Sequence, residues 1–168
     1  SKTDIKSVEG KNSSAISLNG TTAYLVPDMP EHDFRSKLTF SAWVKIKSNF
    51  TGAIFSKMDN SMKYRGYDFW VEKGKVGVHI VNSWPNNAIK ILTDQPIEND
   101  TWQHVAIAYD GSGKAENLKV YINGKLEPHT PVGSAKLLKA TIKNQVPFRI
   151  GGREDGSYFK GDLDDVRI

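Results

Sequence analysis

The sequence lacks cysteine, long apolar runs and nearly all helical periodicity. Without cysteine, the chain has no disulfide framework, thiol nucleophile or thiolate metal site. No apolar run approaches the roughly 20 residues of a membrane-spanning helix. The four histidines occur in unrelated contexts and lack the spacing of a zinc site: His32, His79, His104 and His129. These absences exclude thiol chemistry and a membrane-spanning helix, and they argue against a histidine-based zinc site.

The charge of the chain gives little direction about its partner. Lysine and arginine number 23 and aspartate and glutamate 19, a formal net charge of +4. This excess is compatible with an anionic partner and equally with an ordinary solvated surface. The basic residues do not cluster with aromatic residues as nucleic-acid binders require, so no nucleic-acid partner is predicted. With 38% hydrophobic and 25% charged residues, the 168-residue chain fits one globular domain.

Alternation at period two predicts strands along most of the chain. Residues 38–47 form the clearest case, with Phe40, Ala42 and Val44 on one face. Residues 69–80 read as a hairpin around the Lys73-Gly74 turn, preceded by a polar, aromatic loop that ends at Asp68, and Asn123-Gly124 fits a second tight turn. Only residues 134–143 could form a short helix or turn. About a dozen short strands predict an all-β fold, a two-sheet antiparallel sandwich.

We expect a polar lead-in over residues 1–12 and one β-sandwich domain over residues 13–168. The chain has no initiator methionine and no signal peptide, and it stops abruptly after residues 165–168. We therefore expect it to be one domain of a larger protein.

Four segments occur in an order that resembles a known family: FSAWV at 40–44, WQHVA at 102–106, VYINGK at 120–125 and GDLDDVRI at 161–168. Together they are similar to the laminin G-like domains, concanavalin A-like jelly rolls that include the pentraxins. The stretch from Arg65 through His79 to Trp84 is also similar to inserts in large secreted planctomycete proteins that carry cytochrome c-type domains. The resemblance implies an extracytoplasmic location, secreted or periplasmic.

This fold hosts lectins, glycan-binding modules, protein-binding modules and some hydrolases. The hydrolases of the fold carry a Glu-x-Asp-x-Glu strand, and the sequence has no such pattern. We therefore predict a domain without catalytic activity.

Calcium is the cofactor that the sequence predicts, because calcium prefers carboxylate, amide and carbonyl oxygens. The candidates form two clusters: Asp59, Asn60, Glu154 and Asp155, as the pentraxin resemblance implies, and Asn19, Asp164 and Asp165 near the paired terminal strands. The basic Arg153 departs from the pentraxin pattern. For the first cluster the alternative is a set of solvated turn residues. For the second it is an Asp164 carboxylate held by backbone N–H groups or a basic side chain.

A sugar offers an apolar face to an aromatic ring and a rim of hydroxyls to polar side chains. The loop residues of suitable type are Tyr64, Arg65, Tyr67, Trp84, Asn86, Asn87, Arg153 and Tyr158. Trp84 is the strongest candidate because it lies between Ser83 and Pro85 in a polar loop. The alternative is a tryptophan that closes the end of the sandwich. The other tryptophans are expected to pack inside, although Trp70 could line an exposed sheet face.

We predict a non-catalytic, lectin-like carbohydrate-binding module of a larger secreted protein, with an anionic polysaccharide as one ligand class and a structural calcium. Other domains of the parent protein are expected partners. The competing hypothesis is a protein-interaction or spacer domain without glycan binding. An open groove lined by Trp84 and Tyr67 with Arg65 or Arg153 would favour the glycan hypothesis, and burial of the two aromatic residues would favour the spacer.

Overall fold

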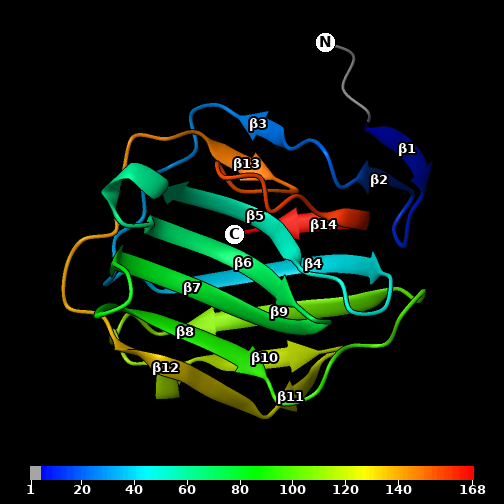
Figure 1. The fold of residues 1–168 in the computed structure, drawn as a ribbon. Helices are drawn as coiled ribbons and strands as arrows, with labels where there is room; N and C mark the ends of the chain where they lie inside the picture. Colours follow the sequence, from blue (N-terminus) through cyan, green and yellow to red (C-terminus); the bar gives the residue numbers. More distant parts are fainter. Residues whose placement is uncertain (1–4) are drawn as a thin grey trace.

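The computed structural model describes residues 5–168 and shows two seven-stranded antiparallel sheets packed face to face (Figure 1). The first, here the β4 sheet, has the order β1 (Lys6–Glu9), β2 (Ser14–Asn19), β14 (Lys160–Arg167), β4 (Leu38–Ile46), β9 (Gln103–Tyr109), β10 (Lys119–Ile122) and β11 (Lys125–Glu127). The second, the β6 sheet, has the order β12 (His129–Leu137), β8 (Asn87–Thr93), β7 (Lys75–Ser83), β6 (Arg65–Glu72), β5 (Gly52–Asp59), β13 (Phe148–Ile150) and β3 (Tyr24–Val26). The predicted two-sheet antiparallel sandwich is confirmed.

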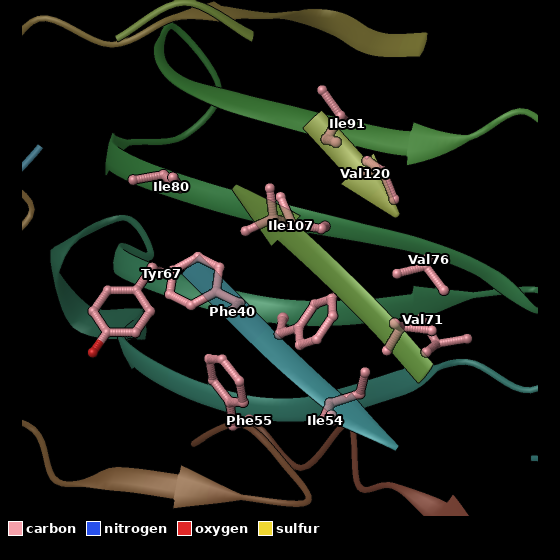
Figure 2. Packing of buried hydrophobic residues seen from close by; sticks show 14 of the residues in the cluster. Phe40, Ile54, Phe55, Tyr67, Val71, Val76, Ile80, Ile91, Ile107 and Val120 are labelled. Atoms are coloured by element: carbon pink, nitrogen blue, oxygen red, sulfur yellow. The ribbon is translucent and has the colours of Figure 1, made fainter. Parts of the chain in front are cut away.

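The core lies between the two sheets and is built from the alternating apolar positions. Phe40 of β4 lies at its centre, with ring centroids 5.4 Å from Phe55, 5.5 Å from Tyr67 and 6.3 Å from Phe69 (Figure 2). All four rings are almost completely buried. Each fully buried large apolar side chain contributes roughly 1.5–3 kcal/mol relative to exposure, so this cluster is a main source of stability.

The β6–β7 hairpin fixes which side chains leave the core. Lys73 and Gly74 both have positive φ values, 52° and 79°, as a two-residue type I′ turn requires. This turn sets a register in which Asp68 lies opposite His79. Since side chains alternate along a strand, Phe69 faces the core while Asp68, Glu72 and their cross-strand partners lie on the outer face of the sheet.

Three parts of the chain differ from expectation. Residues 134–143 form no helix, because β12 extends to Leu137 and pairs with β8. Within the predicted lead-in, β1 pairs with β2, and residues 1–4 lie outside the described residues. Trp43 and Trp102 are half-buried rather than in the core. Lys11 lies 5.2 Å from the centroid of the Trp43 ring, and Lys45 lies 5.2 Å from that of Trp102.

Candidate functional site

A pocket of about 230 Å³ opens on the outer face of the β6 sheet. It is lined by Met58 from β5, His79 and Val81 from β7, Tyr64 and Trp84 from the adjoining loops, and Arg153 from the loop after β13. The residues thus come from three regions of the chain that are far apart in sequence.

The floor of the pocket is apolar. Met58 and Val81 lie on either side of Gly66 in neighbouring strands, since each pairs with it in the sheet register. Both side chains are buried, and they form a small cluster with Ala88 and Ala135. This floor presents no hydrogen-bonding group to a ligand.

Two aromatic side chains form the rim. Trp84 is 36% exposed and Tyr64 is 38% exposed. Their loops are tied together because the Trp84 backbone N–H donates to the Lys63 carbonyl at 3.0 Å. The Tyr64 loop is itself ordered by Asp59, whose carboxylate accepts from the backbone N–H groups that open the short 3₁₀ turn η1 (Asn60–Met62). The rim therefore offers two partly exposed rings on a constrained backbone.

A buried charged network lies beside the floor. The Asp68 carboxylate is fully enclosed and accepts from Arg153 through both Nε, at 2.6 Å, and Nη2. Its other oxygen accepts from the His79 backbone N–H at 3.0 Å and lies 2.8 Å from His79 Nδ1. A buried carboxylate requires such partners, and here the side chains of Arg153 and His79 and one backbone N–H group provide them.

The same network fixes the protonation states. Burial alone would raise the pKa of Asp68, but the charges and hydrogen bonds of Arg153 and His79 outweigh it and lower the pKa to about 2. Burial lowers the pKa of His79 below 6.5 despite the attraction of Asp68, and the cations Arg153 and Lys90 act in the same direction as burial. At neutral pH the imidazole is therefore uncharged, with Nδ1–H donating to Asp68.

Aromatic contacts hold the network in place. The Arg153 guanidinium carbon lies 4.0 Å from the centroid of the Trp70 ring, a cation–π arrangement. The His79 ring makes edge contacts with Trp70 at 5.8 Å and with Trp84 at 5.6 Å between centroids. Trp70, which was expected either inside or on an exposed sheet face, thus packs under the network on the outer face.

This network makes the domain acid-sensitive. Because the pKa of Asp68 is lower in the folded chain than its usual 3.8, its stabilising contribution is complete above about pH 5 and is lost as the pH falls towards 2. A lowering to about 2 corresponds to roughly 2 kcal/mol. His79 changes the stability in the same direction as Asp68. Because its pKa is lower in the folded chain, the unfolded chain takes up the proton first below pH 6.5, and stability falls as the pH falls.

We expect the free energy of unfolding, measured in urea, to decline from about pH 6.5 downward. In the His79→Gln variant the part of this decline that lies between pH 6.5 and 4.5 should shrink. An equal decline in the variant and the wild type would contradict the assignment to His79.

Of the residues predicted to bind ligand, Tyr64, Trp84 and Arg153 come together in the pocket. Arg65 does not line it, because its Nε donates to the Asn82 carbonyl at 3.3 Å. Asn87 is engaged with Asn82 and the Lys139 backbone. Asn86, which is exposed, and Tyr158 also lie outside the lining.

The predicted role of Tyr67 as a ligand-binding residue is wrong. Tyr67 was predicted in a binding loop, but it belongs to β6, is 2% exposed and stacks on Phe40 inside the core (Figure 2). The period-two pattern of β6 continues one step before Phe69, so Tyr67 faces inward. Burial raises the pKa of its hydroxyl to about 12.

The buried Tyr67 hydroxyl has no hydrogen-bond partner among the described residues. A buried polar group without a partner costs roughly 1–3 kcal/mol. Tyr67→Phe is therefore expected to leave the free energy of unfolding unchanged or to raise it by about 1 kcal/mol, as measured by chemical denaturation. A loss of more than about 1 kcal/mol would show that the hydroxyl has a stabilising partner.

The first predicted calcium cluster is partly assembled. The Asn60 backbone N–H donates to the Glu154 carboxylate at 3.3 Å, so the loops after β5 and β13 do meet. One Asp59 oxygen is engaged within its own turn, and Asp155 is exposed. Within residues 5–168, no group of three or more acidic, histidine or cysteine side chains is arranged to hold a metal.

The second predicted cluster does not assemble as expected. Asn19 lies opposite Lys160 in the β2–β14 register, four residues or about 13 Å along the strand from Asp164. Asn19 instead accepts from Thr21. Asp164 accepts from the Asn12 backbone N–H at 2.8 Å, and Asp165 pairs with Arg167. These contacts match the alternative in which backbone and basic groups satisfy the carboxylates.

Sequence reasoning missed Met58, Asp68, His79 and Val81 as parts of the site. A signal was present, because the Lys73-Gly74 turn fixes the hairpin register. Counting outward from that turn places Asp68 opposite His79 and on the same face as Trp70.

A family model described as the concanavalin A-like lectin/glucanases superfamily matches residues 18–168. The chain belongs to this superfamily. No curated protein sequence matches it. Within residues 5–168, no helix is both long and apolar enough to cross a membrane.

Several solved structures share the fold of this superfamily member. Domain 4 of an extracellular GH43 arabinanase from Geobacillus stearothermophilus, in complex with arabinotriose, is 22% identical with a TM-score of 0.58, covering 97% of this chain and 73% of that one. The CBM40 of a Ruminococcus gnavus sialidase, bound to α2,3-sialyllactose, is 17% identical with a TM-score of 0.60, covering 92% and 91%. The CBM66 of Bacillus subtilis is 15% identical with a TM-score of 0.52, covering 98% and 91%. At these identities the similarity demonstrates the fold alone.

Proposed function

We propose that this domain is a non-catalytic carbohydrate-binding module whose ligand occupies the pocket on the outer face of the β6 sheet. The observation that carries the proposal is the rim of Tyr64 and Trp84 beside the fixed guanidinium of Arg153. Aromatic planes suit the apolar face of a sugar ring, and an immobilised polar group suits its hydroxyls.

The size of the pocket supports this ligand class. Pockets for drug-sized molecules usually span about 300–1,000 Å³. A volume of about 230 Å³ suits one sugar ring of a longer chain that continues into solvent. The half-exposed Trp84 and Tyr64 lie at the opening, where such a chain would enter.

The comparisons support the same class. The arabinanase domain, the sialidase CBM40 and the Bacillus CBM66 are modules of carbohydrate-active proteins or carbohydrate-binding modules by name. We extend this role to the present domain, together with an extracytoplasmic location and other domains of a parent protein as partners.

Trp84 and Tyr67, whose exposure was to distinguish a glycan site from a spacer domain, differ in their positions. Trp84 lines an open pocket with Arg153, as the glycan hypothesis requires, whereas Tyr67 is buried. Tyr64 takes the place that was expected for Tyr67.

A glycan microarray probed with the labelled domain tests the proposal. We expect binding to at least one polysaccharide or oligosaccharide, and loss of that signal in the Trp84→Ala variant. Absence of binding to any glycan would contradict the proposal and favour the protein-interaction or spacer hypothesis.

We also propose calcium at the first cluster. Asn60 Oδ1 is a buried oxygen without a hydrogen-bond donor among the described residues, and the backbone N–H of the same residue donates to the Glu154 carboxylate. These are the oxygen types that calcium prefers, and an acceptor without a donor is available for a cation. Asp59, Asn60 and Glu154 would hold the ion and brace the Tyr64 loop.

Calcium should therefore stabilise the domain. Extracellular calcium modules have dissociation constants of about 0.1–1 mM. At 1 mM calcium, a constant of 0.1 mM corresponds to about 1.4 kcal/mol, which raises the melting temperature by about 3–6 °C for a chain of this size. Differential scanning fluorimetry after chelation and re-addition measures this shift, and Asn60→Ala should lose it. An unchanged melting temperature would contradict the proposal.

A further inference from the structure

The pocket contains one formal cation, and a buried carboxylate already neutralises it. Arg153 directs Nε and Nη2 at the same Asp68 oxygen, and the Arg153 side chain is only 12% exposed. Trp70 covers one face of the guanidinium. No other lining residue carries a formal charge at neutral pH. Within the described residues the lining and its buried counter-ion therefore carry no net charge.

A second ion pair lies on the same outer face of the sheet. Lys90 lies opposite His79 in the β7–β8 register, and its ammonium lies 2.6 Å from the Glu72 carboxylate. The same carboxylate accepts from Trp70 Nε1 at 3.2 Å. This second ion pair therefore adds no net charge beside the network.

Two hydrogen-bonding positions remain available. With Nδ1–H directed at Asp68, the neutral His79 ring leaves Nε2 as an acceptor. Arg153 leaves the N–H groups of Nη1 as donors. Neither atom has a hydrogen-bond partner among the described residues. Neither is fully enclosed, so both can be reached by a ligand. One acceptor and one donor site suit hydroxyl groups, which both donate and accept.

We infer that the pocket selects a neutral sugar and not the anionic polysaccharide that was one of the ligand classes expected from the sequence. This inference rests on the proposed function and specifies its ligand class. The sugar ring packs on Trp84 and Tyr64, while its hydroxyls donate to His79 Nε2 and accept from Arg153 Nη1.

An anionic ligand meets an obstacle in the same geometry. A sulfate or carboxylate that takes the Nε–Nη2 edge of the guanidinium has to displace Asp68, and one at the remaining Nη1–Nη2 edge meets a cation that Asp68 already neutralises. That carboxylate is fully buried, so displacement leaves an uncompensated charge in the sheet. A neutral hydroxyl needs only the free Nη1 edge and leaves the Arg153–Asp68 pair intact.

The test is a calorimetric titration of the whole chain with two sets of oligosaccharides. The neutral set contains oligomers of arabinan, xylan, galactan and mannan. The acidic set contains oligogalacturonate, alginate and chondroitin sulfate. Each titration is run in 50 mM and 500 mM sodium chloride, and the Trp84→Ala and Tyr158→Ala variants assign the binding to the pocket or elsewhere.

We expect a neutral oligomer to bind at least tenfold more tightly than any acidic one. Its dissociation constant should change less than twofold between the two salt concentrations, because no net charge is involved. Tightest binding of an acidic oligomer, weakened tenfold or more by salt and lost in Trp84→Ala, would overturn the inference while leaving carbohydrate binding intact. Binding to neither set would overturn both.

Discussion

Replacement of Asp68 by asparagine is expected to lower the free energy of unfolding by about 3–5 kcal/mol. The substitution keeps the size of the side chain but removes the charge that Arg153 and His79 require. Arg153 then stays largely buried over Trp70 without a counter-ion, and the His79 N–H groups lose a charged acceptor. For a domain of this length the melting temperature should fall by about 6–20 °C.

Asp162→Asn is the matched control for this prediction. Asp162 pairs with Lys45 at 2.9 Å on the outer face of the other sheet, where the side chains are 16% and 36% exposed, in contrast to the fully buried Asp68. Exposed pairs contribute about 0–1 kcal/mol, so the control should unfold close to the wild-type midpoint. Equal losses in the two variants, measured by urea denaturation, would mean that the buried network is not specially stabilising.

Replacement of Trp84 by alanine is expected to weaken carbohydrate binding by about 30- to 1,000-fold. Aromatic residues that anchor a ligand typically contribute about 2–4 kcal/mol when truncated, and each 1.4 kcal/mol is a factor of ten in affinity. Trp84 forms the rim of the pocket and also packs on the edge of His79. The variant therefore removes both the stacking surface and one wall of the acceptor position.

Tyr158→Ala serves as the control because Tyr158 and Trp84 are equally exposed, at 36%. Tyr158 was predicted as a ligand residue, yet its ring lies against the Gly152 backbone and outside the pocket lining. We expect binding within about twofold of the wild type. If Tyr158→Ala weakens binding as much as Trp84→Ala, the ligand extends beyond the pocket described above.

Local patterns accounted for the fold because alternation and turn chemistry are properties of neighbouring residues. The alternating run that contains Phe40 and Val44 gives the buried face of β4. The Lys73-Gly74 turn gives the β6–β7 hairpin and its register. The only segment assigned helical potential, residues 134–143, instead joins the edge of a sheet as far as Leu137, where pairing with β8 overrides local preference, and continues as a loop.

The site was only partly predictable, since its central contact joins residues 85 positions apart. Nothing near Arg153 in the sequence indicates that its partner is Asp68 rather than a sulfate or carboxylate of a ligand. Tyr67 and Asp68 show the complementary difficulty. They are adjacent in sequence but face opposite sides of the sheet. Because both were assigned to one loop, neither the core position of Tyr67 nor the place of Asp68 in the buried network was predicted.

The most direct test of a carbohydrate pocket on the β6 sheet is the response of the four tryptophan indole N–H signals to ligand. They can be assigned in a ¹⁵N correlation spectrum by Trp→Phe variants. Trp84 lines the pocket and Trp70 packs beneath it, whereas Trp43 and Trp102 belong to the other sheet and its adjoining loop. During titration with the tightest-binding oligosaccharide, we predict shifts at Trp84 and smaller ones at Trp70, with Trp43 and Trp102 unchanged. Shifts at Trp43 or Trp102 with Trp84 unmoved would contradict this account of the site.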